Sequence, residues 1–200
     1  MFGSANTLTA WLIALTRLGD AAVLLPLIAV MLSWLMLVRF QRAAAWWVIS
    51  VVLCAVFTGA LKLFFYGCPR VLDLSNPSGH ASLSTLVYGA ISLVTATESS
   101  GVLLRTFIIT GSVGLIVSIA ASRLLLHIHS VFEVGLGIGI GTLALALFAR
   151  CYLRCRPKNI SLTPLYMASG ALVLAMYGRR VFDADTLLSH VAGYFQRFCS

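Results

Sequence analysis

Residues 43–65, AAAWWVISVVLCAVFTGALKLFF, form an apolar stretch in which Lys62 is the single charged side chain. A helix needs about 20 predominantly apolar residues to cross the hydrocarbon core of a bilayer, so this stretch is long enough to span one. In lipid the backbone must satisfy its own hydrogen bonds, and a helix does so within one segment. The stretch therefore predicts a transmembrane helix.

Further apolar runs of comparable length occur along the chain. Of its 200 residues, 60% are hydrophobic and only 10% are charged, and the mean hydropathy is +0.98. A soluble domain has roughly 25% charged residues. We therefore predict an all-α polytopic membrane protein, a single domain over residues 1–200 with six transmembrane helices. The five other predicted spans are Ala21–Val38, Ala81–Thr97, Val102–Ala121, Val131–Phe148 and Ile160–Tyr177.

The two ends of the chain show a shorter, amphipathic pattern. In residues 1–20, leucine and tryptophan recur at helical spacing up to Gly19, which is a stop signal. In the tail, residues 179–200, an apolar helical face follows Asp185, which suits an N-cap. We expect both segments to be helices that lie in the membrane interface. The N-terminus lacks the basic start of a secretory signal, so none is expected.

The cations in the loops predict the orientation of the protein in the membrane. With six alternating spans, residues 39–42, 98–101 and 150–159 share one side, and short loops rich in Lys and Arg stay in the cytoplasm. The opposite side then faces the periplasm or exterior, which suggests a bacterial inner (cell) membrane. The formal net charge of +8 suits anionic membrane lipids, because no basic groove with interleaved aromatic residues suggests a nucleic acid. The sequence does not determine the oligomeric state.

Three short polar clusters lie at the predicted outer ends of the spans. Ionisable groups at that depth are costly, and by default they mark a functional site. Cations combined with a pair of histidines suit a phosphate ester better than a peptide or a sugar. The clusters are Lys62 with Pro69-Arg70; Pro77-Ser78-Gly79-His80; and Ser122-Arg123 with His129 and Glu133.

The second cluster precedes a predicted span. A helix start offers free N–H groups and a partial positive charge, which together bind phosphate. Gly79 permits a close backbone approach, Ser78 adds a hydroxyl donor, and His80 suits general acid catalysis. Taken alone, the tetrapeptide is equally compatible with a proline-led N-cap and an incidental histidine.

In the third cluster, His129 and Glu133 are four residues apart, which places them on one helical face. A carboxylate there fixes the tautomer of the imidazole and leaves its other nitrogen free to act as a nucleophile. His127 lacks such a partner. The alternative is a satisfied interfacial His–Glu pair. The cations Lys62, Arg70 and Arg123 would neutralise a phosphoryl group.

The three clusters resemble the motifs of the type 2 phosphatidic acid phosphatases. These motifs are Lys, six residues, Arg-Pro; Pro-Ser-Gly-His; and Ser-Arg, five residues, His, three residues, Asp. The second motif matches fully, whereas Pro69-Arg70 reverses the Arg-Pro of the first and Glu133 replaces the Asp of the third. The resemblance covers residues 62–133.

The resemblance also implies roles for these residues. His129 would attack phosphorus and form a phosphohistidine, His80 would protonate the leaving group, and Glu133 would support His129. No metal or other cofactor is implied. The residues that would hold the phosphate are Lys62, Arg70, Ser78, Gly79 and Arg123.

We therefore expect hydrolysis of a lipid phosphate or pyrophosphate at the outer membrane face. The candidate substrates are an isoprenoid pyrophosphate such as undecaprenyl pyrophosphate, phosphatidylglycerol phosphate, phosphatidate and lipid A. One alternative is a phosphotransferase that passes the phosphoryl group to another lipid, and a second is a catalytically silent lipid-binding or transport protein. A third is a metal hydrolase that uses His80, His127, His129 and Glu133.

The glycines between Gly135 and Gly141 alternate with other residues inside a predicted span. Glycines four apart let helices approach closely, so we interpret the run as a packing surface and not as a nucleotide loop. On this interpretation, a bulky residue at Gly139 disturbs the packing.

Overall fold

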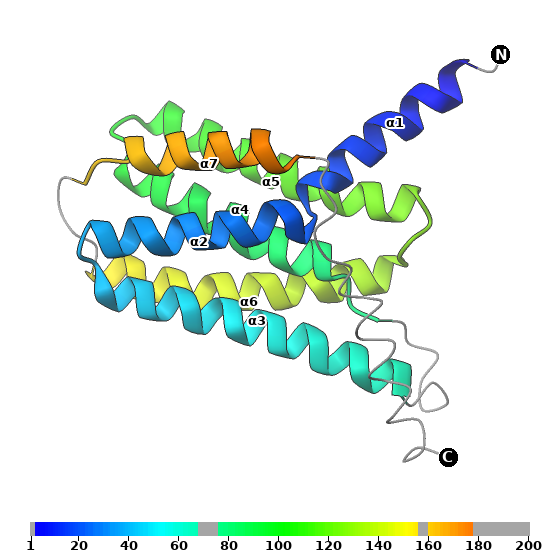
Figure 1. Cartoon of the computed structure of the whole chain (residues 1–200), viewed down its shortest axis with the longest axis horizontal. Helices are drawn as coiled ribbons and strands as arrows, with labels where there is room; N and C mark the ends of the chain where they lie inside the picture. Colours follow the sequence, from blue (N-terminus) through cyan, green and yellow to red (C-terminus); the bar gives the residue numbers. More distant parts are fainter. Residues whose placement is uncertain (1–2, 68–75, 156–159, 178–200) are drawn as a thin grey trace.

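The computed structural model describes residues 3–67, 76–155 and 160–177, and within these ranges the regular secondary structure is entirely helical (Figure 1). The predicted all-α class is therefore confirmed for the described part of the chain. The helices are α1 (Gly3–Leu18), α2 (Ala21–Leu37), α3 (Gln41–Gly67), α4 (Gly79–Glu98), α5 (Val102–Leu125), α6 (Val131–Cys155) and α7 (Thr163–Met176).

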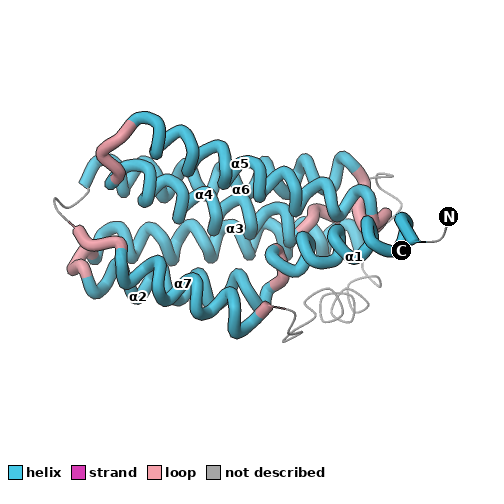
Figure 2. Tube along the Cα trace, turned by 90° about the horizontal axis from the view of Figure 1, so that it is seen from above, coloured by secondary structure: helices cyan, strands magenta, loops and turns pink. Residues whose placement is uncertain are grey.

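Helices α2 to α7 lie side by side in an elongated bundle, and α1 leaves one end of it (Figures 1 and 2). Helix α4 occupies the middle, where it packs against α2, α3, α5 and α6. The buried core is built by α2, α3, α4 and α6, with Trp47, Phe148 and Tyr152 among its largest fully buried side chains. The rings of Trp47 and Phe148 meet edge to face at 5.3 Å, a favourable geometry for aromatic pairs.

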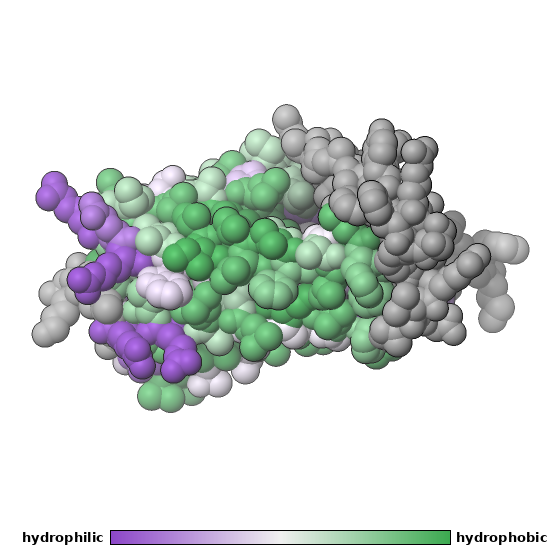
Figure 3. Space-filling model, turned by 90° about the horizontal axis from the view of Figure 1, so that it is seen from below, coloured by the Kyte–Doolittle hydropathy of each residue, from purple (hydrophilic) through white to green (hydrophobic). Residues whose placement is uncertain are grey.

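The outer surface of the bundle is strongly apolar. Figure 3 shows a broad hydrophobic belt, with hydrophilic residues gathered at one end of the molecule. Helix α5 contributes much of this surface, since only 6% of its span is buried within the protein. These properties indicate a membrane protein. Among the described residues, the stretches that are long and apolar enough to cross a bilayer are Thr9–Leu37, Gln41–Phe65, Val102–Leu125 and Val131–Arg154.

Two of the six predicted spans are not among these stretches. Residues 81–97 form most of α4, whose mean hydropathy is reduced by several Ser and Thr side chains that face its neighbours. Residues 160–177 contain α7, which has only 14 residues. The number of six transmembrane helices therefore stays a prediction.

The structure describes the first of the two predicted terminal helices but not the second. Helix α1 ends at Leu18, directly before Gly19, as the sequence predicts. Its place in the membrane interface stays a prediction, because α1 and α2 together also form one of the four apolar stretches. Asp185 and the tail, residues 179–200, lie outside the described residues.

The glycine run of α6 is a packing surface, but its register differs from our expectation. A Cβ atom on Gly137 would lie 2.6 Å from the carbonyl oxygen of Ser78, and one on Gly141 would overlap that of Ser82. In contrast, a Cβ atom on Gly139 would meet nothing within 4 Å. The expected role of Gly139 is therefore wrong, because the two glycines that face α4 are one helical turn apart and Gly139 points elsewhere.

This register yields a matched pair of variants. We expect Gly141→Leu to lower the melting temperature in detergent and to reduce phosphate release, since overpacking costs about 1–3 kcal/mol. Gly139→Leu adds the same side chain to the same helix without a clash, so its melting temperature should stay at or above the wild-type value. Equal melting temperatures for the two variants would show that α4 and α6 do not pack in this register.

Candidate active site

The predicted site residues gather at one end of the bundle. There α3 and α5 end, α4 and α6 begin, and the corner between α1 and α2 covers them (Figure 2). Four polar members of the predicted site are almost completely buried at this end. Their exposed fractions are 5% for Lys62, 0% for Ser78, 7% for Arg123 and 8% for Glu133.

His129 and Glu133 form the hydrogen-bonded pair that their spacing predicts. Nδ1 of His129 lies 2.8 Å from Oε2 of Glu133, which also accepts the backbone N–H of Ser130 at 2.8 Å. The hydroxyl of Ser130 in turn accepts the N–H of Glu133. This reciprocal arrangement is a capping box, and its signature, Ser-x-x-Glu before an apolar run, is present in the sequence although our prediction did not use it. It fixes the carboxylate that orients His129.

The environment of His129 favours the neutral imidazole. Burial lowers the pKa of His129 below its usual 6.5, and the nearby charges of Arg123 and Lys62 lower it further. The hydrogen bond that His129 donates to Glu133, and the negative charge of Glu133, raise this pKa but do not reverse the shift. With its Nδ1–H donated to Glu133, the neutral ring has its lone pair on Nε2. His129 is therefore held as an oriented, neutral imidazole at neutral pH, a state that suits a nitrogen nucleophile.

The Pro-Ser-Gly-His cluster lies at the start of α4, beside the first turn of α6. The N–H of Ser78 donates to the carbonyl oxygen of Glu133 at 3.0 Å, which joins the start of α4 to the first turn of α6. Ser78 is the N-cap of α4, where its hydroxyl accepts the N–H of Ala81 and keeps its own proton for another acceptor. Nζ of Lys62 lies 3.7 Å from the position of a Cβ atom on Gly79. A cation and a helix start thus meet in a geometry that suits a phosphate.

Arg123 comes from the last turn of α5. Its Nη1 donates to Oγ1 of Thr16 in α1, at 3.2 Å. The carbonyl oxygen of Arg123 accepts the N–H of His129, so the turn between α5 and α6 closes back on the arginine. His127 is exposed in this turn with a φ of 53°, and it contributes to the turn's shape. The structure therefore separates the two neighbouring histidines, and His129 is the one inside the site.

His80 has a partner that our sequence reading missed. Its Nε2 lies 2.6 Å from Oδ1 of Asp20, at the corner between α1 and α2. Thr16 and Asp20 both belong to the N-terminal region, for which we predicted only an interfacial role. The signal in the sequence is slight, a single acid directly before an apolar span. Arg70 and Pro69 lie outside the described residues, so the predicted role of Arg70 stays a prediction.

Comparisons with known proteins agree with the motifs. Residues 66–157 match the model of the PAP2 superfamily. An "uncharacterized 22.5 kDa protein in cps region" of Klebsiella pneumoniae is 35% identical over 135 residues, which cover 65% of this chain and 64% of the relative. The chain thus spans less than two thirds of the relative's length. No solved structure is significantly similar.

The PAP2 superfamily generally comprises phosphatases, and this supports a hydrolase that acts on phosphate esters. The matched segment contains the start of α4, the end of α5, the turn that follows it and the start of α6, which carry His80, Arg123, His129 and Glu133. The resemblance stated from the motifs is thus confirmed, since residues 66–157 match the PAP2 superfamily model.

Proposed function

We propose that the protein hydrolyses a lipid phosphate or pyrophosphate without a metal, through a phosphohistidine on His129. The observation that carries this proposal is the buried His129–Glu133 pair with Lys62 and Arg123 around it. These cations supply the positive charge that phosphoryl transfer needs, because catalysis there rests on positioning and electrostatic stabilisation.

The reaction proceeds in two steps. Nε2 of His129 attacks phosphorus, the bond from phosphorus to the ester oxygen breaks, and His80 gives a proton to that leaving oxygen. Water then attacks the phosphohistidine and transfers a proton to His80, while the bond from nitrogen to phosphorus breaks. Phosphate is released, and both histidines return to their starting protonation states. Lys62, Arg123 and the first N–H groups of α4 hold the phosphoryl oxygens in both steps.

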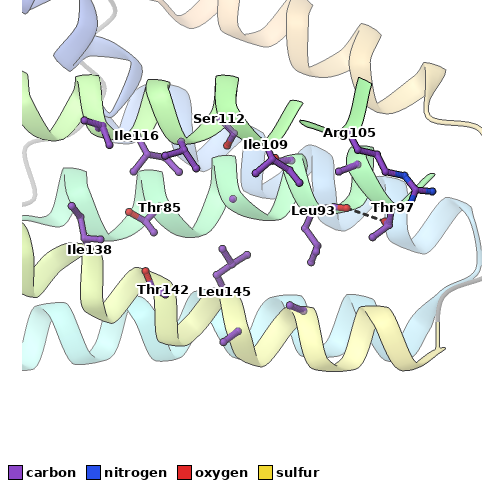
Figure 4. Close-up of a pocket in the computed structure, with 17 residues that line it drawn as sticks. Thr85, Leu93, Thr97, Arg105, Ile109, Ser112, Ile116, Ile138, Thr142 and Leu145 are labelled. Carbon is purple, nitrogen blue, oxygen red and sulfur yellow. Dashed lines mark hydrogen bonds between the residues drawn. The ribbon is translucent and has the colours of Figure 1, made fainter. Parts of the chain in front are cut away.

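A long groove beneath the site supports a lipid substrate. It has a volume of about 760 Å³ and lies between α4, α5 and α6, whose labelled side chains point into it in Figure 4. Its lining is mainly aliphatic and runs from Thr85 and Ile138 to Thr97 and Arg105. Thr85 follows His80 by five residues, so at 1.5 Å per helical residue the near end lies roughly 8 Å along the helix axis from the catalytic acid.

The length of the groove also favours a hydrocarbon chain. In α4, Thr97 follows Thr85 by twelve residues, which corresponds to about 18 Å along the helix axis. This distance exceeds half the thickness of a typical hydrocarbon core, which is about 30 Å. We propose that the phosphate occupies the polar end of the bundle and that one chain of the same molecule follows the groove. The other partners in this proposal are membrane lipids.

The orientation in the membrane is part of the same proposal. The helix ends near Arg39, Arg42 and Arg154 lie at the opposite end of the bundle from the site, as the alternation of helices requires. Because short cationic loops stay in the cytoplasm, the site faces the periplasm or exterior. The candidate substrates are those of the sequence analysis: isoprenoid pyrophosphate, phosphatidylglycerol phosphate, phosphatidate and lipid A.

A substrate panel tests the proposed function. Purified full-length protein in detergent is given each candidate lipid, and glycerol 3-phosphate serves as the soluble match for phosphatidate. We expect kcat/KM for at least one lipid to exceed that for glycerol 3-phosphate by more than tenfold, since each buried methylene contributes about 0.8 kcal/mol. Free phosphate is the readout, which distinguishes hydrolysis from transfer to another lipid. Release that is absent for every lipid, or no faster than from glycerol 3-phosphate, would contradict the proposal.

A further inference from the structure

The carboxylate of Asp20 pairs with a histidine side chain and does not cap the helix that follows it. Asp20 occupies the N-cap position of α2, where an aspartate normally accepts a backbone N–H of the first turn. Its side chain makes no such bond. Instead Oδ1 lies 2.6 Å from Nε2 of His80, a distance typical of a charge-assisted hydrogen bond. The side chains of Asp20 and His80 are 32% and 23% exposed, so the pair is partly shielded from water.

The backbone around Asp20 fits closely against α4 and α5. A Cβ atom on Gly19 would lie 2.8 Å from Cγ2 of Ile119 and 3.3 Å from Cδ2 of His80. The corner can therefore approach the imidazole only because residue 19 is a glycine. The hydroxyl of Tyr88 donates to the carbonyl oxygen of Leu18 at 2.7 Å and anchors the corner on α4.

A further contact fixes the corner to the phosphate-binding side of the site. Thr16, one turn before Asp20, accepts a hydrogen bond from Arg123. The corner thus contacts both a proposed phosphate ligand and the proposed general acid. These contacts hold Asp20 in place and make its pairing with His80 a property of the fold.

We propose that Asp20 is a positioning residue for the general acid His80. The inference rests on the proposed function, because it assumes that His80 protonates the leaving oxygen. Asp20 accepts the Nε2–H of His80, so Nδ1 is the nitrogen that exchanges protons with the reaction. In the acid form both nitrogens carry a proton; the proton on Nδ1 moves to the leaving oxygen, while the proton on Nε2 stays there and remains hydrogen-bonded to Asp20. When water attacks the phosphohistidine, its proton returns to Nδ1.

The two histidines then have complementary arrangements. Glu133 accepts from Nδ1 of His129 and leaves Nε2 to attack phosphorus. Asp20 accepts from Nε2 of His80 and leaves Nδ1 to move the proton. The two histidines therefore have different roles although their side chains are chemically identical. Each role depends on which ring nitrogen donates its hydrogen bond to a carboxylate.

The test uses two substrates with the same chain and different leaving groups. One is an alkyl phosphate, whose alkoxide needs a proton, and the other is a nitrophenyl phosphate with an alkyl chain on its ring, whose phenolate does not. We expect Asp20→Asn to lower kcat for the alkyl phosphate by about 10- to 100-fold, a part of what general acid catalysis contributes. For the nitrophenyl ester, kcat should change less than threefold, roughly. A merely structural role would lower both rates equally.

Two further variants sharpen the result. Asp20→Asn combined with His80→Ala should be no slower on the alkyl phosphate than His80→Ala alone, because Asp20 acts through His80. Glu98→Gln is the matched control, since Glu98 is a carboxylate at the opposite end of the bundle, where it accepts from Tyr152. It should behave as the wild type on both substrates.

The outcomes separate this inference from the proposed function. Wild-type rates for Asp20→Asn on the alkyl phosphate, or equal losses on both substrates, would overturn the role of Asp20 and leave the phosphatase proposal standing. If the wild-type protein hydrolysed neither ester, the proposed function itself would fail, and the role of Asp20 would fail with it.

Discussion

Replacing His129 by alanine is expected to abolish phosphate release from the preferred lipid, with a loss in kcat on the order of 10⁴-fold or more. The loss is large because the variant removes the atom that forms a bond to phosphorus, and no other described histidine is held in the same way. Nδ1 of His129 is fixed by Glu133, and its lowered pKa keeps Nε2 unprotonated at neutral pH. Water would have to attack the ester directly, without the covalent intermediate.

His127→Ala is the matched control for this prediction. His127 precedes the nucleophile by two residues but is exposed in the turn, so its loss should change kcat only slightly. A radiolabelled phosphate ester, followed by an alkaline quench, should label the wild-type protein and His127→Ala but not His129→Ala. Phosphate release by His129→Ala within tenfold of the wild type would exclude the phosphohistidine mechanism.

Arg123→Ala is expected to lower kcat/KM by about 10²- to 10³-fold. A preorganised donor that stabilises transition-state charge contributes on this scale. Arg123 is 7% exposed, and its guanidinium donates to Thr16, so water replaces it poorly. The kcat/KM of Arg123→Lys should lie between those of Arg123→Ala and the wild type, because lysine restores the charge but not the planar set of donors.

The control for Arg123 is Arg42→Ala, which removes an exposed cation near the start of α3, at the other end of the bundle. It should retain wild-type kcat/KM. Size-exclusion profiles in detergent check that each variant is folded. If Arg123→Ala kept its kcat/KM within threefold of the wild type while folded, Arg123 would have no part in binding the phosphoryl group.

The helices were predictable because the signals that specify them are local. The apolar runs gave the cores of α2, α3, α5 and α6, and their ends were the least accurate part. The run that we ended at Phe148 continues as helix to Cys155, because Arg150 and Arg154 reduce hydropathy without breaking a helix. Hydropathy marks the part of a helix that suits lipid, whereas helix propensity and capping set where it ends.

The site was predictable to the extent that its contacts are short in sequence. The pairing of His129 with Glu133 follows from an i,i+4 spacing, and the structure confirms it. Asp20 lies 60 residues from His80, and Thr16 lies 107 residues from Arg123, so these contacts depend on how the helices pack. For the same reason the sequence revealed a glycine surface on α6 but not which of its glycines face α4.

The groove beside α5 also determines the route by which the proposed lipid substrate would enter. Helix α5 packs mainly on α4 and only slightly on α6, and most of its surface is apolar and exposed. Under the proposed function, a hydrocarbon chain of the lipid substrate reaches the groove sideways from within the bilayer. Encounter then occurs by diffusion in two dimensions, and the rate of turnover follows the mole fraction of substrate in the membrane. Adding inert lipid at a fixed bulk concentration of substrate slows such an enzyme, as dilution in water slows a soluble one.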